Sequence, residues 1–297
     1  MNRRDFGELV LTLRQDMGWT QYQLAEYSER DIAVISQIER GVKKYFEPEL
    51  LFCLANAFQL STLERKEFIL AASGLEEQHI VRQPSTVVAT DVFNPQKILE
   101  RMVGLTGEIR LPAVLIDVYS DVIAANRMML AFYNVPSSTL ESAASVPGGY
   151  NTVRLNFGRD LVGRMHVSDN WDHYAMNSMR AFRANSLRYR ARPYFKYLMK
   201  AFRNPVEYPF FDRFWKLVSS TEQDKDVNVD QFSYYHTQFG QLKYVASTTT
   251  AITSFGNLFL TQNLPLDDHT EEVFTQLKLK AGLGVVPFAS WPEKSMP

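Results

Sequence analysis

Residues 20–41 read TQYQLAEYSERDIAVISQIERG, and this stretch predicts two short helices joined by a tight turn. Thr20 and Asp31 suit the N-termini of the two helices, because their side-chain oxygens accept hydrogen bonds from unpaired backbone N–H groups. Gly41 suits the end of the second helix, since glycine adopts positive φ without strain. Apolar residues at helical spacing give each helix one buried side. We therefore expect a capped helix from Asp31 whose opposite side stays accessible.

The accessible side of the second helix has the composition of a surface that reads DNA bases. Glutamine pairs with adenine edges in the major groove, and small apolar groups contact thymine methyls. Free backbone N–H groups at the start of the first helix suit a phosphate. The sequence thus predicts binding to double-stranded DNA, with Gln37 as the first choice for base readout; the alternative is the solvated side of an ordinary helix pair. The expected DNA-binding residues are Gln21, Tyr22, Ile32, Ala33, Ser36, Gln37, Arg40 and Lys43.

Charge in residues 1–45 is balanced, with seven Lys or Arg against seven Asp or Glu. Attraction to phosphates must therefore come from local placement, and non-specific DNA binding should be modest and salt-dependent. Arg14 and Glu39 fall on the inner sides of their helices. We expect them to form a structural ion pair rather than to contact DNA.

The segment from Phe6 to about Leu60 resembles the Xre-type helix-turn-helix regulators. Two positions depart from the pattern of that family. Glu29 stands where the turn has a glycine, and Arg30 stands where it has an aliphatic residue. We therefore expect a widened turn with altered packing, and the capped second helix is retained.

The chain has 297 residues, which is too long for one such module. At about 100–200 residues per domain, its length predicts a small domain and a larger one. Apolar helical stripes continue to about residue 73, so we expect a five-helix DNA-binding domain over 1–75. A linker and a connecting helix follow over 76–108, and a larger domain covers 109–297.

The larger domain shows strands, then helices, then strands. Two strands are predicted at 112–119 and 121–125, a helical insertion over 150–219, three more strands over 229–262, and a last helix from Thr270. This order is typical of a PAS-like α+β sensor fold, with a five-stranded antiparallel sheet and a helical insertion. The fold class is therefore multi-domain: an all-α domain plus an α+β domain.

Segments 112–116, 122–127, 151–155 and 210–215 carry a second resemblance. They are similar to parts of the ligand-binding domain of MmyB-like transcription regulators, and the similarity covers most of the chain. The resemblance implies a regulator whose PAS-like domain holds a small amphiphile, with fatty acids as the leading class. Ala125 stands where this family often has tryptophan, which we expect to enlarge or reshape the pocket.

Aromatic and methionine side chains at helical and strand spacing suit an acyl chain, although ordinary core packing produces the same stripes. A carboxylate headgroup would need hydrogen-bond donors, for which Arg154, Tyr174, Ser178 and His236 are candidates. The expected ligand-binding residues are Leu115, Met128, Phe132, Arg154, Trp171, Tyr174, Ser178, Phe211, Trp215, Tyr234 and His236.

The stretch 151–203 is strongly basic, with eleven Lys or Arg against three Asp. It either contacts DNA that flanks the binding site or pairs with the acidic segment that follows it. We favour pairing or plain solvation, because runs of charge usually lie on solvated surfaces.

No catalytic or metal site is expected. The five histidines lack the spacing of metal ligands, and the single cysteine, Cys53, cannot form a disulfide framework. We expect no enzymatic activity and no required cofactor, apart from a bound fatty acid. No export segment and no apolar run of about 18 residues occur, so we expect a cytoplasmic protein without membrane insertion.

These expectations combine into a dimeric DNA-binding transcription regulator that senses a small amphiphilic ligand. In a homodimer, two recognition helices about 34 Å apart enter successive major grooves, so a rotation through the connecting helix would change DNA affinity. The alternative is a larger domain that only dimerises the chain or recruits a partner protein, without a ligand. A third reading gives this domain a redox or haem cofactor.

Overall fold

The structure is a computed structural model that describes residues 1–73, 94–143, 145–146, 148–159, 171–220 and 231–294. These residues divide into two compact units, called here unit 1 and unit 2. Unit 1 contains residues 1–73, 179–199 and 213–220, and unit 2 contains the other described residues. The predicted linker over 76–93 lies outside the described residues.

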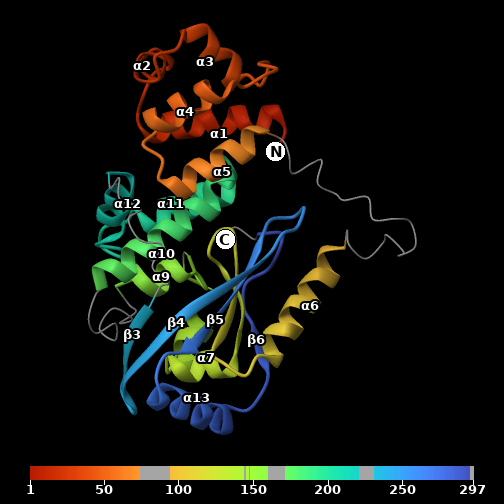
Figure 1. The fold of residues 1–297 in the computed structure, drawn as a ribbon, viewed down its shortest axis with the longest axis vertical. Helices are drawn as coiled ribbons and strands as arrows, with labels where there is room; N and C mark the ends of the chain where they lie inside the picture. The colour runs from red at the N-terminus through yellow and green to blue at the C-terminus, as the bar shows by residue number, and fades with distance from the viewer. Residues whose placement is uncertain (74–93, 144, 147, 160–170, 221–230, 295–297) are drawn as a thin grey trace. The chain divides into compact units, whose positions relative to one another are not determined.

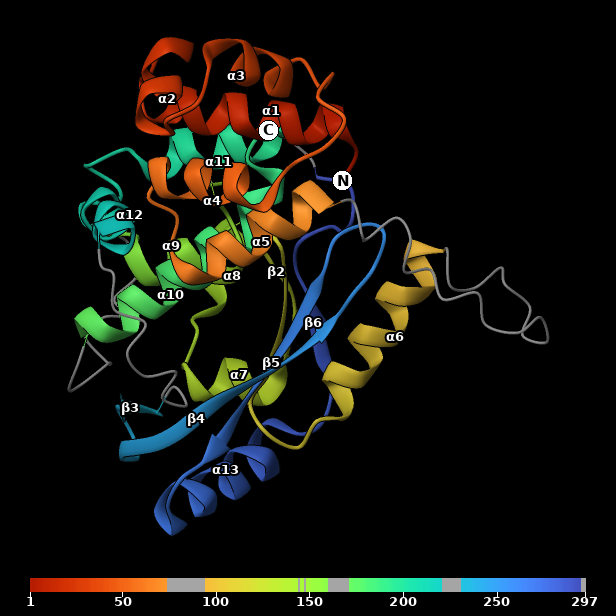
Figure 2. The same ribbon diagram turned by 45° about the horizontal axis from the view of Figure 1, so that its top comes forward.

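Five helices form the N-terminal part of unit 1, at the places where the sequence predicts them (Figure 1). α2 and α3 lie next to each other, on the opposite side of this group from α5 (Figures 1 and 2). Thr20 and Asp31 precede α2 and α3, as expected for capping residues. The helices are α1 (Arg3–Asp16), α2 (Gln21–Tyr27), α3 (Ile32–Glu39), α4 (Pro48–Ala57) and α5 (Thr62–Ser73).

Unit 1 also contains parts of the predicted helical insertion. These parts come from α10 (Trp171–Ser186), the short turn η3 (Leu187–Tyr189), α11 (Pro193–Phe202) and α12 (Phe211–Ser220). η3 contacts α1 and α5, and its Leu187 is fully buried in the same apolar cluster as Phe6 and Phe68. The core of unit 1 is therefore built from two stretches of chain that lie more than 100 residues apart in sequence.

Unit 2 contains a six-stranded antiparallel sheet in its described part, with strand order β3-β4-β5-β1-β2-β6. The expectation of five strands is wrong by one. The added strand, β6, has three residues and pairs with the edge of β2, so it is too short to show an alternating pattern in the sequence. The strands are β1 (Ala113–Asp117), β2 (Val122–Asn126), β3 (Gln231–His236), β4 (Gly240–Ala251), β5 (Leu258–Pro265) and β6 (Val285–Pro287).

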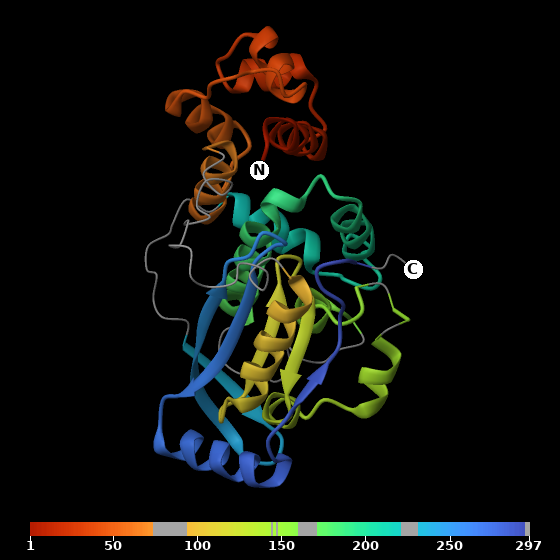
Figure 3. The same cartoon turned by 90° about the vertical axis from the view of Figure 1, so that its right-hand side faces the viewer.

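Helices cover both faces of this sheet. On one face, α6 (Pro95–Glu108) covers the sheet and packs on Leu115, Ile123 and Leu258 (Figure 3). On the other face lie α7 and α13, which pack on a second apolar cluster (Figure 1). The remaining helices are α7 (Arg127–Phe132), α8 (Ser137–Ala143), α9 (Thr152–Phe157) and α13 (Asp268–Ala281).

Two buried asparagines fix the chain where strands and helices meet. Asn126 caps α7 by accepting from the Met129 backbone N–H at 2.9 Å, and its amide nitrogen donates to the Leu111 carbonyl at 2.7 Å. Asn151 caps α9, and its amide nitrogen donates to Oδ1 of Asp121 at 2.8 Å. Each side chain therefore satisfies buried polar groups outside the regular ladders.

A buried charge cluster closes the turn between β1 and β2. Asp117 Oδ1 accepts from the backbone N–H groups of Tyr119 and Asp121, at 2.9 and 3.0 Å. Lys294 Nζ lies 2.6 Å from Asp117 Oδ2 and 2.8 Å from Asp121 Oδ2. Burial raises the pKa of Asp117 to about 6, because the nearby Lys294 offsets the desolvation only in part and Asp121 adds repulsion.

The raised pKa of Asp117 predicts how the stability of the fold depends on pH. The carboxyl of Asp117 binds its proton more tightly in the folded protein than in the unfolded chain. The protonated carboxyl therefore adds to the free energy of unfolding below about pH 4, and this addition is lost as pH rises through about 6. The loss is on the order of 2–3 kcal/mol. In urea unfolding between pH 4 and 7.5, wild type should lose stability relative to Asp117→Asn as pH rises. A difference that does not change with pH would contradict this.

Candidate functional site

Both helices of the α2–α3 pair have the caps that the sequence predicts. Thr20 Oγ1 accepts from the Gln23 backbone N–H at 3.2 Å, and the Gln23 side chain accepts from the Thr20 backbone N–H at 2.8 Å. Asp31 Oδ1 accepts from the Ala33 backbone N–H at 2.7 Å. These contacts fix the starting points of α2 and α3, and hence the direction in which α3 presents its side chains.

The turn between α2 and α3 closes without a glycine. Glu29 adopts a positive φ of 53°, a conformation that costs free energy for residues with a Cβ. Its backbone N–H donates to the Glu26 carbonyl at 3.1 Å, and that of Arg30 donates to the Ala25 carbonyl at 2.9 Å. This pair of bonds is a common helix end, and the expected widening of the turn stays a prediction.

Arg14 and Glu39 form the predicted structural ion pair. Arg14 Nε and Nη2 donate to the two carboxylate oxygens of Glu39 at 2.6 and 3.0 Å, and Nη1 donates to the Trp19 carbonyl at 2.6 Å. Gln21 Nε2 also donates to Glu39, at 2.7 Å. The Gln21 side chain is therefore engaged within the protein, and α1, α2 and α3 are held in one arrangement.

The structure leaves most of the predicted DNA-binding side chains on the surface of unit 1. Tyr22, Ile32, Ala33, Gln37 and Arg40 are exposed. The remaining three, Gln21, Ser36 and Lys43, are half-buried.

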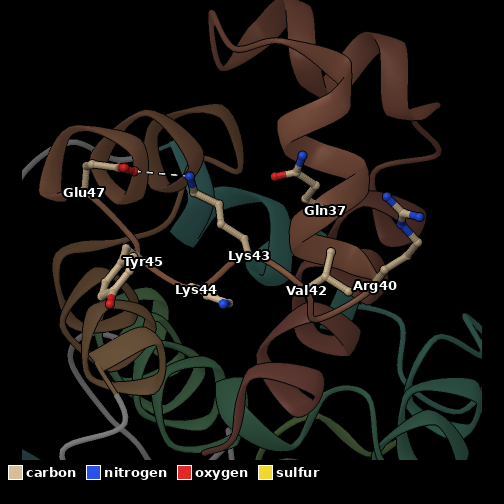
Figure 4. Close-up of a pocket in the computed structure, with 7 residues that line it drawn as sticks. All are labelled: Gln37, Arg40, Val42, Lys43, Lys44, Tyr45 and Glu47. Carbon is tan, nitrogen blue, oxygen red and sulfur yellow. Dashed lines mark ion pairs between the residues drawn. The ribbon is translucent and has the colours of Figure 1, made fainter.

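An open groove of about 490 Å³ continues from α3 into the segment after it (Figure 4). Gln37 and Arg40 line it from α3 and its C-terminal end. The other side is formed by Val42, Lys43, Lys44, Tyr45 and Glu47. Lys43 pairs with Glu47 at 3.4 Å, whereas Lys44 and Tyr45 are exposed, Tyr45 by 77%. The sequence prediction missed Lys44 and Tyr45, although their position three and four residues after the helix-ending Gly41 was a usable signal.

A fully buried carboxylate, Glu64 on α5, lies between two guanidinium groups of unit 1. Arg183 Nε and Nη2 donate to it at 2.9 and 3.0 Å, and Arg190 Nη2 donates at 2.5 Å. The Trp215 ring lies against both, with its centroid 4.8 Å and 5.0 Å from the two guanidinium carbons. Burial raises the pKa of Glu64, but the charges of Arg190 and Arg183 outweigh it and lower the pKa to about 2.

Further members of the basic stretch 151–203 pair with the N-terminal helices. Arg188 Nη2 lies 2.8 Å from a carboxylate oxygen of Glu67 on α5, and Arg192 Nη2 lies 4.0 Å from one of Asp5 on α1. The expected pairing is therefore present. Arg203 Nε lies 3.9 Å from Oδ1 of Asp212, which follows the stretch, whereas the partners of Arg188 and Arg192 precede it. The reason is that the second half of the insertion folds into unit 1. Arg164 lies outside the described residues.

An aromatic cluster fills the side of the unit 2 sheet that carries α7 and α13. The ring centroid of Phe132 lies 4.9 Å from that of Tyr234 and 5.4 Å from that of Tyr244. Phe232 extends the cluster, with its centroid 5.6 Å from Tyr244 and 5.3 Å from Tyr174. The cluster joins residues from β3, β4, α7 and α10.

Several expected ligand-binding residues belong to this cluster or adjoin it. Met128, Phe132 and Tyr234 are buried in it. Tyr174 donates to the side chain of Asn156 at 3.2 Å, and Ser178 accepts from the same side chain at 2.7 Å. Trp171 has its ring centroid 6.0 Å from that of Tyr174.

Other expected ligand-binding residues lie elsewhere. Leu115 points to the opposite face of the sheet, beneath α6, because side chains alternate along β1 and those of Val114 and Ile116 face the aromatic cluster. Trp215 belongs to unit 1, next to the buried ion cluster. Phe211 packs in unit 2 against Phe157 and Phe202. Helical spacing alone could not separate these positions.

The two charged or titratable headgroup candidates have partners within the chain. Arg154 Nη1 donates to the Gly149 carbonyl at 3.1 Å. His236 Nδ1 accepts from the Gln238 backbone N–H at 3.1 Å. Both side chains are buried and help to hold their own loops.

Comparison with known proteins decides the family. Residues 99–277 match the sequence profile described as the MmyB-like transcription regulator ligand binding domain, which is more than half of the chain. The chain is an MmyB-like transcription regulator. It is also 37% identical over 78 residues to the competence pilus inhibition repressor of Acinetobacter baylyi, a match that covers 26% of this chain and 68% of that protein.

The segments of this regulator that carry the family resemblance have structural positions. Residues 122–127 form β2 and the start of α7, residues 151–155 form the capped start of α9, and residues 210–215 form the start of α12. Ala125 is buried on the face of the aromatic cluster. The expected change in pocket shape at this position stays a prediction.

The described residues of the regulator contain no membrane-spanning helix and no cluster of metal ligands. No helix there has both the length and the apolar character to cross a bilayer. No group of three His, Cys, Asp or Glu side chains there is arranged to hold a metal ion.

The buried ion cluster makes a prediction for stability. Glu64→Gln leaves two buried guanidinium groups without their counter-charge and should destabilise unit 1 by roughly 3–5 kcal/mol at pH 7. Because the pKa of Glu64 is lowered in the folded state, this difference should shrink as pH falls below about 4.5.

The matched control is Glu67→Gln on the same helix, whose carboxylate pairs with Arg188 but is 29% exposed. This change should cost only about 0–1 kcal/mol. Urea unfolding of the full chain, followed by circular dichroism, measures both values. Equal effects of the two substitutions would refute the special role of Glu64.

Proposed function

We propose that this MmyB-like regulator binds double-stranded DNA in a sequence-specific manner, as an Xre-type helix-turn-helix protein. The observation that carries the proposal is the accessible strip of α3, formed by Ile32, Ala33, Gln37 and Arg40, on a helix whose inner side and cap are fixed. A rigid strip of this kind fits the major groove. The relative from Acinetobacter baylyi is a repressor, which is consistent with a DNA-binding role.

The chemistry of the strip assigns a role to each part. Gln37 would pair with an adenine edge, and Ile32 with Ala33 would contact thymine methyls. Arg40 and Lys44, on either side of the groove, would contact phosphates of the backbone. The ion pair between Arg14 and Glu39 holds the helices in register, so the strip needs no reordering on binding.

We further propose that unit 2 holds a small amphiphile, most simply a fatty acid, and that this ligand changes the DNA affinity of a homodimer. Support comes from the family and from the apolar and polar groups that meet in the aromatic cluster of unit 2. A coupling free energy of about 1–3 kcal/mol between the two sites would be enough to switch regulation.

The second candidate is that unit 2 only dimerises the chain or recruits a partner protein, without a ligand. The close aromatic contacts of Phe132 with Tyr234 and Tyr244 favour it, because they are those of an ordinary packed core.

The DNA contacts predict separable effects in binding to a duplex selected from random sequences. Gln37→Ala should weaken that complex by about 1–3 kcal/mol and leave binding to unrelated DNA nearly unchanged. Lys44→Ala should weaken both and lower the salt slope by about one. Gln15→Ala, an exposed glutamine on α1, is the control. If Gln37→Ala behaves like Gln15→Ala in fluorescence anisotropy, α3 does not read the bases.

Ligand sensing predicts that removing bound lipid changes DNA binding. The affinity of the full chain for the selected duplex should change by about 5- to 150-fold after delipidation, and added dodecanoic acid should reverse the change. Native mass spectrometry before and after the treatment checks that lipid was present and was removed. An unchanged affinity would contradict ligand sensing without contradicting DNA binding. It would favour the alternative that unit 2 only dimerises the chain or recruits a partner protein.

A further inference from the structure

Several uncharged polar groups gather beside the aromatic cluster of unit 2. The hydroxyl of Tyr133, which follows α7, lies 3.4 Å from that of Tyr244 on β4. The hydroxyl of Tyr174 on α10 donates to Asn156 on α9, which in turn donates to Ser178 at 2.7 Å. These side chains come from four different elements, so their meeting is a tertiary feature that no local pattern in the sequence predicts.

Asn263 on β5 completes this group. Its side chain is 3% exposed and lies beside the phenol of Tyr133. The amide nitrogen of Asn263 has no partner within hydrogen-bond geometry among the described residues. The Tyr133 hydroxyl is the acceptor near this amide, and the contact offsets in part the rise that burial causes in the pKa of Tyr133. An amide nitrogen carries two donor hydrogens, and leaving a buried donor without a well-placed partner costs free energy, so Asn263 has donor capacity left for a further acceptor atom.

The described surroundings of this group are largely apolar, and the titratable ring of His236 has its centroid 6.5 Å from that of Tyr234. Burial raises the pKa of Tyr133 and of Tyr234, and the other groups that act on these two phenols are tyrosines and an asparagine. The phenols therefore stay protonated and remain hydrogen-bond donors at neutral pH. Phe132, Phe232 and Leu242 supply the neighbouring apolar surface.

We infer that Tyr133, Tyr174, Tyr244, Asn156 and Asn263 form the polar end of a ligand site that takes an uncharged oxygen group on an apolar molecule. A hydroxyl, an ester carbonyl or a protonated carboxylic acid fits such donors. An ionised carboxylate does not, because it would be desolvated next to phenols and amides without a counter-charge. This inference rests on the ligand-sensing part of the proposed function and narrows its ligand class.

Two probes of equal chain length test the inference. The full-length delipidated protein is titrated with 1-dodecanol and with dodecanoate, and binding is followed by the change in intrinsic tyrosine and tryptophan fluorescence. At pH 7.5, dodecanol should bind at least tenfold more tightly. Between pH 5.5 and 7.5, dodecanol affinity should stay constant and dodecanoate affinity should fall about tenfold per pH unit, because only the neutral acid is accepted.

Three variants distinguish the loss of a hydrogen bond to the ligand from a general change in packing. Tyr174→Phe and Tyr244→Phe remove single hydroxyls with little change in volume, and each should weaken dodecanol binding about three- to tenfold. Tyr235→Phe, an exposed residue on β3, is the matched control and should bind like wild type. Thermal unfolding of each variant checks that it is folded.

The inference is overturned if dodecanoate binds as tightly as dodecanol at pH 7.5, if neither binds, or if the two buried variants match Tyr235→Phe. A failure of the sensing proposal gives a different result. In that case dodecanol binds as described, but the affinity for DNA does not change when it is added.

Discussion

A single buried carboxylate, that of Glu64, constrains the architecture of unit 1. An ionised group with no solvent contact needs opposite charge close by, and Arg183 and Arg190 supply it from positions 119 and 126 residues further along the chain. α5 therefore reaches its final environment only when the insertion is in place. Leu187, buried in the apolar core of the same unit, adds a hydrophobic reason for the same arrangement.

The geometry of the proposed DNA-reading surface depends on this arrangement of unit 1. α1 contacts α5 and η3. It also contacts α3, to which it is linked by the ion pair between Arg14 and Glu39. The caps at Thr20 and Asp31 then set the direction of α3. One continuous set of contacts thus connects the buried ion cluster with Gln37. The packing of unit 1 therefore sets the direction in which the exposed side chains of α3 point.

Local sequence signals predicted the helices, their caps and most strands, because these depend on neighbours within a few residues. They also placed Gln37 and Arg40 on the outer side of α3. They could not predict β6, which has only three residues, or the side of the sheet that Leu115 faces. The Ser61-to-Glu64 spacing is typical of a capping box, yet nothing local shows that Glu64 also pairs with Arg183 and Arg190.

The division of unit 1 between distant stretches has a consequence during synthesis. At about 5–20 residues per second, a ribosome takes roughly 6–25 s to advance from Glu64 to Arg190. Until residues 183–190 are synthesised at the end of that interval, the nascent N-terminal helices lack Leu187 and both guanidinium partners of Glu64. The emerging chain therefore cannot mature in N-to-C order, and its exposed apolar surface is available to chaperones until the insertion leaves the exit tunnel.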